Sequence, residues 1–410
     1  MNNDTPLLRV ENLCQYFKSG GNELKAVDGI SFDIRKGEVF GLVGESGCGK
    51  TTTGRSVIKL YKITSGNIWF EGTRIGAGTR AAEEEMRRAR RECAETCRRL
   101  KKEKDAEGIR REREKLEAFL REKKREIAQA KEDDAHCNKR FAAAKVQALR
   151  EEYEPKFAAC APEEREALEK EFRAKLRVAK KERITNKIQM IFQDPVASLN
   201  PRMTVRDTIA EGLIIKGIRN KKYIDEQVYK MLDLVGLVSE HAGRYPHEFS
   251  GGQRQRIGIA RAIIMEPELI IADEPISALD VSIQAQVINL LNDLRKSLGL
   301  TVLFIAHDLS VVKYFSDRIA VMYYGKIVEL ADADELFAHP LHPYTKSLLS
   351  AIPLPDPVYE RKRKRVSYSP LLAHDYSKEA PQFREVSPGH FVLCDQKEYR
   401  AYLDALKQKT

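Results

Sequence analysis

Long apolar runs are missing from this 410-residue sequence. A helix needs about 20 apolar residues in a row to cross a bilayer. The longest apolar pieces, such as residues 269–272 and 301–306, have only the length of a buried strand. Residues 1–6 are polar and lack the basic, apolar and small-residue regions of a signal peptide. We therefore expect a soluble protein that stays in the compartment of its synthesis, so that any role at a membrane passes through partners.

Cysteine is scarce. The chain has seven, an odd number scattered along a long sequence, which argues against a disulfide framework. The formal charge is +10, a value that could indicate nucleic acid or anionic lipid as a partner. A large part of this charge, however, lies in one segment with the composition of solvated helix. No nucleic-acid partner is expected.

Glycine and proline become rare between residues 77 and 185, where roughly every second residue is charged. The flanking parts, residues 1–76 and 186–337, instead alternate short buried-strand runs with helical patterns, which is typical of a parallel sheet covered by helices. Residues 338–410 begin rich in proline and histidine and then turn basic. The sequence thus predicts an α/β domain that is interrupted by a charged segment (residues 77–185) and followed by a C-terminal region (residues 338–410).

A thin apolar stripe runs through the charged segment at spacings of three and four. This spacing predicts an antiparallel, coiled-coil-like helical hairpin and not a globular core. Asp133, Asp134 and Asn138 mark the expected point of reversal. Pro155 and Pro162 should interrupt the returning limb, because proline lacks the amide proton that a helix interior needs. Partial disorder is the alternative, since so charged a stretch can bury little apolar surface.

A glycine-rich loop with the pattern G-x-x-x-x-G-K-T follows an apolar strand at residues 39–43 and precedes a helix-capable run at residues 52–60. Its glycines allow backbone N–H groups to surround the β- and γ-phosphate oxygens of a nucleotide, and the helix start adds a positive dipole end. Lys50 supplies a charge to the same oxygens, and the Thr51 hydroxyl can bind Mg²⁺. The predicted nucleotide contacts are Gly44, Glu45, Ser46, Gly47, Cys48, Gly49, Lys50, Thr51 and Thr52.

Two acids, Asp273 and Glu274, end a second buried strand. A parallel strand delivers the side chains at its C-terminal end into the nucleotide crevice. Asp273 is therefore expected to hold Mg²⁺ through water. Glu274 is expected to take a proton from the attacking water or to polarise it.

Several further motifs, in order along the chain, resemble those of the ATP-binding cassette (ABC) ATPases. The adenine-stacking aromatic is Phe17, with Tyr16 as the alternative, and the Q-loop glutamine is Gln193. The signature sequence includes Ser250-Gly251-Gly252-Gln253, the D-loop is residues 277–280, and the switch histidine is His307. The resemblance covers the chain except the charged segment and part of the C-terminal region. It implies a P-loop ABC nucleotide-binding domain that hydrolyses ATP with Mg²⁺.

The resemblance also implies a role for each motif. Ser250, Gly251 and Gly252 open a helix whose N–H groups can bind the γ-phosphate of an ATP held by the lysine loop of a second ABC ATPase subunit, identical or paralogous. His307 would stabilise charge in the transition state, and Gln193 would sense Mg²⁺ or the lytic water. The other implied partners are two transmembrane permease subunits and, indirectly, an extracytoplasmic solute-binding protein. The implied location is the cytoplasmic face of the cell membrane.

Two stretches indicate a branch of the family. Residues 195–202 and 339–345 resemble those of the oligopeptide and dipeptide importer ATPases. A nickel or other small-solute importer shares much of this pattern and remains an alternative, as does a DNA-acting ABC ATPase with a coiled-coil insert. Members of the peptide group often carry a cysteine cluster in the tail. The stretch that ends at Cys394 keeps one thiol, so no iron–sulfur cluster is expected there.

The charged segment admits several interpretations. It can be a solvated helical hairpin without a specific partner, or an arm that docks a membrane or regulatory subunit, because it precedes the Q-loop. A metal site is the third interpretation. Its candidate ligands are Cys93, Cys97, His136, Cys137 and Cys160.

Overall fold

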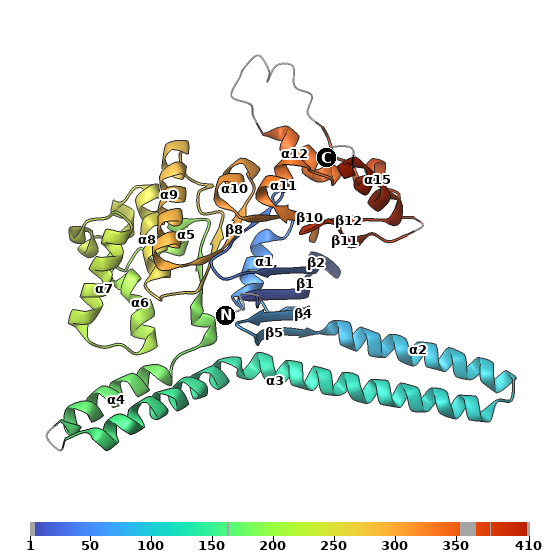
Figure 1. Ribbon diagram of the computed structural model, residues 1–410, viewed down its shortest axis with the longest axis horizontal. Helices are drawn as coiled ribbons and strands as arrows, with labels where there is room; N and C mark the ends of the chain where they lie inside the picture. The colour runs from blue at the N-terminus through green and yellow to red at the C-terminus, as the bar shows by residue number, and fades with distance from the viewer. Residues whose placement is uncertain (1–4, 162–163, 353–365, 378, 408–410) are drawn as a thin grey trace, which may run out of the picture.

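The computed structural model describes residues 5–161, 164–352, 366–377 and 379–407 (Figure 1). Its central element is an eight-stranded sheet in the order β11-β12-β10-β9-β3-β8-β7-β6, and a four-stranded antiparallel sheet in the order β2-β1-β4-β5 lies beside it. The strands of the large sheet are β3 (Val39–Val43), β6 (Ile188–Ile191), β7 (Leu269–Asp273), β8 (Thr301–Ala306), β9 (Arg318–Tyr323), β10 (Lys326–Asp332), β11 (Gln382–Ser387) and β12 (His390–Cys394). Those of the small sheet are β1 (Leu8–Ser19), β2 (Asn22–Ile34), β4 (Ser65–Phe70) and β5 (Thr73–Thr79).

The predicted parallel sheet is present, and it is buried on both faces. β9, β3, β8, β7 and β6 run parallel to one another. Successive residues of a strand point to opposite faces. In β8, for example, Phe304 packs into a cluster on the helical face, whereas Leu303 and Ile305 pack into a second cluster toward the small sheet. This double burial explains why β8 is apolar throughout and not alternating.

The helices that cover or flank the sheets follow the strands in sequence. They are α1 (Lys50–Val57), α5 (Pro195–Ser198), α6 (Val205–Lys216), α7 (Lys221–Leu234), α8 (Gly251–Ile263), α9 (Val281–Leu298), α10 (Leu309–Phe315), α11 (Ala333–Ala338), α12 (Pro343–Ala351), α14 (Pro370–Ala373) and α15 (Gln396–Lys407). Short 3₁₀ turns are η1 (Ile184–Lys187), η2 (Ser239–Gly243) and η3 (Pro246–Glu248).

The charged segment forms α2 (Arg80–Lys102), α3 (Ala106–Ala159) and α4 (Arg165–Ala179). Figure 1 shows α3 crossing below the small sheet, with α2 beside its first half and α4 beside its last turns. The prediction that the chain reverses at Asp133, Asp134 and Asn138 is wrong, because α3 runs through all three. The chain turns instead between α2 and α3, where Lys104 adopts a left-handed conformation (φ 58°) and Asp105 accepts a hydrogen bond from the Gly108 N–H.

The polar residues in the middle of α3 attach the helix to the α/β domain. Asp133 lies 2.6 Å from Arg74 of β5, and Asp134 lies 2.9 Å from Lys59, just beyond α1. Asn138 accepts hydrogen bonds from Thr185, and the buried Cys137 packs into the apolar cluster that the small and large sheets share. Their polarity therefore reflects these partners and not a turn.

Proline interrupts the segment less than predicted. α3 continues through Pro155 for four more residues to Ala159, and Pro162 lies outside the described residues. Tyr153 is fully buried and its ring lies 5.1 Å from that of Phe172 in α4. Phe157 also contacts Phe172, at a ring distance of 5.5 Å. This aromatic cluster holds the helix end on both sides of the proline.

The C-terminal region joins the large sheet. β12 pairs with β10 and β11 with β12, both antiparallel, so the sheet is extended by strands that the sequence analysis did not predict. The buried carboxylate of Glu329 in β10 accepts hydrogen bonds from the Leu341 and His342 N–H groups at 2.7 and 3.1 Å. It also lies 2.9 Å from His390 Nε2. These contacts fix the chain just before α12.

His342 caps α12 in its neutral form. Its Nδ1 accepts the Tyr344 N–H at 3.1 Å, and burial, with His374 and Lys346 nearby, lowers its pKa from 6.5 to about 3. The unfolded chain binds a proton near pH 6.5 and the folded chain does not. This contribution to stability is therefore present above pH 6.5 and is lost as the pH falls below it.

We expect the His342→Asn variant to lose less stability on acidification than the unchanged protein. The asparagine amide oxygen can also cap a helix but does not titrate. Between pH 7.5 and pH 5 the difference should reach about 2 kcal/mol. Thermal unfolding of both proteins at the two pH values measures it. Equal losses in the two proteins would show that His342 is not the group responsible.

Candidate nucleotide-binding site

The glycine-rich loop leaves the end of β3 and leads into α1, at the carboxyl edge of the parallel sheet. Two of its glycines are required by space as well as by backbone angle. A Cβ on Gly44 (φ 154°) would lie 2.1 Å from the Met322 carbonyl oxygen, and one on Gly49 (φ 107°) would lie 2.2 Å from that of Ala26. The loop is therefore held closely against two neighbouring strands.

Lys50 lies inside this loop. Its ammonium donates hydrogen bonds to the carbonyl oxygens of Gly44 (2.7 Å) and Glu45 (2.8 Å), and the side chain is 3% exposed. An ammonium has three protons, so it can bind the loop backbone and still meet a phosphate oxygen. Cys48 is also buried, and burial raises the pKa of its thiol although Lys50 lies beside it. The cysteine is thus a neutral part of the loop framework.

The pair Thr51 and Asp273 fits a magnesium ion. The Thr51 hydroxyl donates to Asp273 Oδ1 at 2.7 Å, whereas Asp273 Oδ2 is buried without a hydrogen-bond partner in the part of the chain that the structure describes. Burial raises the pKa of Asp273 and outweighs the hydrogen bond from Thr51. A buried, unpaired carboxylate oxygen is costly, and a hard cation with oxygen ligands would relieve it.

Glu274 follows Asp273 in the chain, and its carboxylate contacts two side chains. Gln193 Nε2 donates to its Oε2 at 3.0 Å, and His307 Nδ1 lies 3.2 Å from the same oxygen. The backbone of Glu274 is left-handed (φ 44°), and its N–H bonds to the Ile305 carbonyl. A non-glycine residue at positive φ is strained, and here the strain accompanies a carboxylate fixed beside the loop.

These groups share one cleft of 880 Å³. It is lined by Phe17, Leu24, Ala26, Ser46, Gly47, Gly49, Lys50, Thr51, Thr52, Gln193, Asp194, Glu274, Ser277, Ala278 and His307. The structure thus brings together the loop, the acidic strand end, the predicted Q-loop glutamine and the predicted switch histidine. Gly44, Glu45 and Cys48 form the framework of the loop and do not line the cleft, and neither does the fully buried Asp273.

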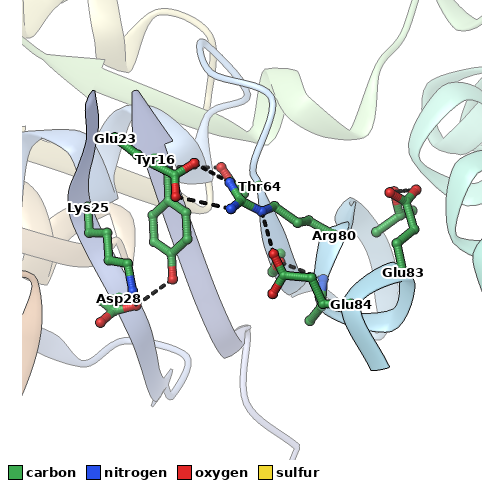
Figure 2. Close-up of polar contacts among 11 residues, drawn as sticks. Tyr16, Glu23, Lys25, Asp28, Thr64, Arg80, Glu83 and Glu84 are labelled. Atoms are coloured by element: carbon green, nitrogen blue, oxygen red, sulfur yellow. Dashed lines mark hydrogen bonds and ion pairs between the residues drawn. The ribbon is translucent and has the colours of Figure 1, made fainter. Parts of the chain in front are cut away.

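The two aromatic alternatives point to opposite faces of β1. Phe17 lines the cleft, whereas Tyr16 lines a second cleft on the side of α2 and α3. Figure 2 shows the Tyr16 hydroxyl hydrogen-bonded to Asp28. Nearby, Arg80 of α2 forms ion pairs with Glu23 of β2 and with Glu84. Strand alternation accounts for the separation of Tyr16 from Phe17. Of the two, Phe17 is the aromatic residue placed to meet a base.

The predicted signature residues lie apart from this cleft. Ser250 caps α8 and accepts a hydrogen bond from the Gln253 N–H at 3.4 Å, while the Gln253 side chain bonds back to the Ser250 N–H at 3.0 Å. Ser250, Gly251, Gly252 and Gln253 are absent from the lining of the cleft. One chain therefore does not bring all the predicted residues to one place.

One residue at the loop was missed by the sequence analysis. The Glu45 N–H donates to the Tyr344 hydroxyl at 3.0 Å. The motif around Tyr344 was interpreted only as a mark of the family branch, because nothing in local sequence connects residues 299 positions apart. The cysteines of the charged segment do not gather. Cys93 and Cys97 face each other at 3.9 Å in α2, whereas Cys137 lies below the small sheet.

Comparison with known proteins decides the family. The ABC transporter family model matches residues 27–155 and 158–277, and the model described as "Oligopeptide/dipeptide transporter, C-terminal region" matches residues 328–378. The chain belongs to the ABC transporter family. The DNA-acting alternative has no support among these matches to transport proteins.

Individual relatives cover nearly the whole of this ABC transporter chain. The oligopeptide transport ATP-binding protein OppF of Bacillus subtilis is 48% identical over 397 residues, covering 97% of this chain and 98% of that protein. The dipeptide transport ATP-binding protein DppF of Lactococcus lactis is 41% identical over 402 residues, covering 97% and 96%. The solved structure of cbiO1 from Clostridium perfringens has a TM-score of 0.50 at 20% identity, covers 82% of this chain and 92% of that one, and supports the fold alone.

Two features are absent from the described ranges of the chain. No helix there combines the length and apolarity that crossing a membrane requires. Nor do these ranges contain three or more His, Cys, Asp or Glu side chains grouped so that they could hold a metal ion.

The opposite orientations of Phe17 and Tyr16 give a direct test. We expect Phe17→Ala to weaken ATP binding about tenfold, since stacking on a base is worth about 1–3 kcal/mol. Tyr16→Phe should leave ATP affinity unchanged because its hydroxyl faces the other side of the sheet. Titration with a fluorescent ATP analogue measures both. A large loss in the Tyr16 variant with none in the Phe17 variant would reverse the assignment.

Proposed function

We propose that this chain is the ATP-hydrolysing subunit that powers import of oligopeptides or dipeptides through a membrane ABC transporter. The observation that carries the catalytic part is the position of Glu274, which is held by Gln193 and His307 next to the Thr51–Asp273 pair. Its carboxylate lies where a water molecule attacking a phosphate held by the lysine loop would need a base. The family supports the same reaction, since ABC transporter subunits of this kind hydrolyse ATP.

The predicted site residues have separate roles in nucleotide binding and hydrolysis. Lys50 and the loop N–H groups bind the phosphates, and Phe17 stacks on the adenine. Thr51, Asp273 (through water) and Gln193 would hold Mg²⁺. When bound, this ion neutralises phosphate charge and orients the γ-phosphate. Glu274 accepts the proton of the attacking water, and His307 stabilises negative charge in the transition state.

A second ATPase subunit completes the site. Ser250, Gly251, Gly252 and Gln253 carry the N–H groups of a helix start, a natural site for phosphate, yet they lie outside the cleft of their own chain. Two subunits placed head to tail would bring this helix start to the γ-phosphate bound by the other chain. The subunit partners, identical or paralogous, would act with two permeases at the cytoplasmic face of the membrane and with an external solute-binding protein.

Peptide cargo is supported by the printed names of the relatives and by the match of the C-terminal region. No observation favours a nickel importer over it. In this proposal the catalytic domain comprises residues 1–76 and 186–337. The charged segment (residues 77–185) is an insertion, and the C-terminal region (residues 338–410) is an importer-type extension.

Two substitutions separate nucleotide binding from turnover. We expect Lys50→Ala to abolish ATP binding because the charge at the loop is lost. Glu274→Gln should bind ATP but lower turnover by at least about 100-fold, the scale of general-base catalysis. Binding and phosphate release measured on the purified transporter test both. Normal hydrolysis by the Gln variant would contradict the assignment of Glu274 as the base.

A matched pair at Ser250 tests the second subunit. Asp and Asn both cap helices well, so α8 should fold in each variant, but only Asp places a negative charge where the γ-phosphate is expected. Ser250→Asp should therefore abolish hydrolysis while ATP binding by the isolated chain is retained, and Ser250→Asn should keep a substantial part of the activity. Full hydrolysis by the Asp variant would rule out the head-to-tail arrangement.

A further inference from the structure

The C-terminal region reaches the glycine-rich loop through one side chain. Tyr344 lies in the first turn of α12 and is 1% exposed. Its hydroxyl accepts the Glu45 N–H at 3.0 Å. This is a contact to the backbone of the loop, so it depends on the position of Glu45 and not on its side chain.

Glu45 in turn holds Lys50. Its carbonyl oxygen accepts the Lys50 ammonium at 2.8 Å, and the same oxygen accepts the Cys48 N–H at 3.3 Å. The residue is therefore bonded on one side to Tyr344 and on the other to the cation that meets phosphate. Displacement of Glu45 would move an acceptor of Lys50 and widen the turn that precedes the helix.

The ring of Tyr344 is fixed from several elements. It lies 4.4 Å from the ring of Tyr323, at the end of β9, and 5.4 Å from that of Tyr368. His342 accepts the Tyr344 N–H at 3.1 Å. A buried ring with so many contacts has little freedom, so its hydroxyl presents a nearly fixed point to the loop.

We propose that Tyr344 is a positioning residue for ATP hydrolysis, through which the C-terminal region sets the phosphate affinity of the glycine-rich loop. The inference rests on the proposed nucleotide site. It adds that residues outside the catalytic domain hold the loop in its binding shape. A loop already held in that shape loses less freedom when it binds phosphate, and its affinity is correspondingly higher.

The test is Tyr344→Phe, which removes the hydroxyl and keeps the ring. Loss of this partly buried hydrogen bond should weaken ATP binding about 5- to 10-fold. Because the contact acts on the phosphate side, affinity for inorganic tripolyphosphate should fall by the same factor. Phe17→Ala, on the adenine side, should weaken ATP binding and leave tripolyphosphate binding unchanged. A variant that merely unfolds in part would not reproduce this difference between the two ligands.

Tyr368→Phe is the matched control, since it deletes a hydroxyl from the same aromatic cluster without touching the loop. It should bind both ligands within about twofold of the unchanged protein, a difference of at most ~0.4 kcal/mol. Tyr344→Phe affinities equal to those of the unchanged protein would overturn the proposal, as would equal losses in the Tyr368 variant. If the unchanged protein fails to bind ATP, the proposed function itself fails, and the two outcomes are distinct.

A measurement on the unchanged protein covers the case in which Tyr344→Phe does not fold. The Glu45 amide should exchange slowly with deuterium before any nucleotide is added, because its proton is bonded to the hydroxyl of the buried Tyr344 side chain. Exchange of this amide at the rate of an open loop would overturn the proposal without any substitution.

Discussion

The hydrogen bond between Thr51 and Asp273 joins two positions that are 222 residues apart in sequence. It can form because β3 and β7 both pair in parallel with β8, so the strand that leads to the loop and the strand that ends in the acid finish at the same edge. The bond leaves the second oxygen of Asp273 buried and unpaired, and Glu274 follows directly with its two partners. The lysine loop, the two acids and the histidine thus take their places from the parallel order of the central strands, whereas Phe17 comes from β1 of the small sheet.

The strands and loops of this centre could be predicted, because its residues lie in short motifs next to apolar strands. Val39–Val43 and Thr301–Ala306 are strands as expected, and their loops carry the lysine and the histidine of the cleft. Local pattern is informative where a few consecutive residues determine both the backbone and the chemistry. It also left Phe17 and Tyr16 as alternatives, and the structure separates them because they lie on opposite faces of β1 and line different clefts.

Predictions failed where the decisive contacts are distant. Asp133 and Asn138 suggested a turn by their type, but each has a partner on the α/β domain that local sequence does not reveal. The strands β11 and β12 were missed because they lie at the sheet edge with exposed or half-buried residues, and so lack the fully buried run of β3 and β8. Tyr344 belongs to a motif that the sequence analysis noticed, yet its contact with Glu45 depends on how the whole C-terminal region folds back.

The docking of α3 near its middle has a mechanical consequence. At about 1.5 Å per residue, its 54 residues give a length of about 80 Å along the helix axis, and Asp133 and Asp134 attach it close to the midpoint. A rod pivoted at its centre moves its two ends in opposite directions. A tilt of about 5° would shift each end by roughly 3–4 Å, given that length. Lys59, one of the attachment points, lies just beyond the helix that starts at the glycine-rich loop. A small displacement near the nucleotide would thus become a larger displacement at the two ends of α3.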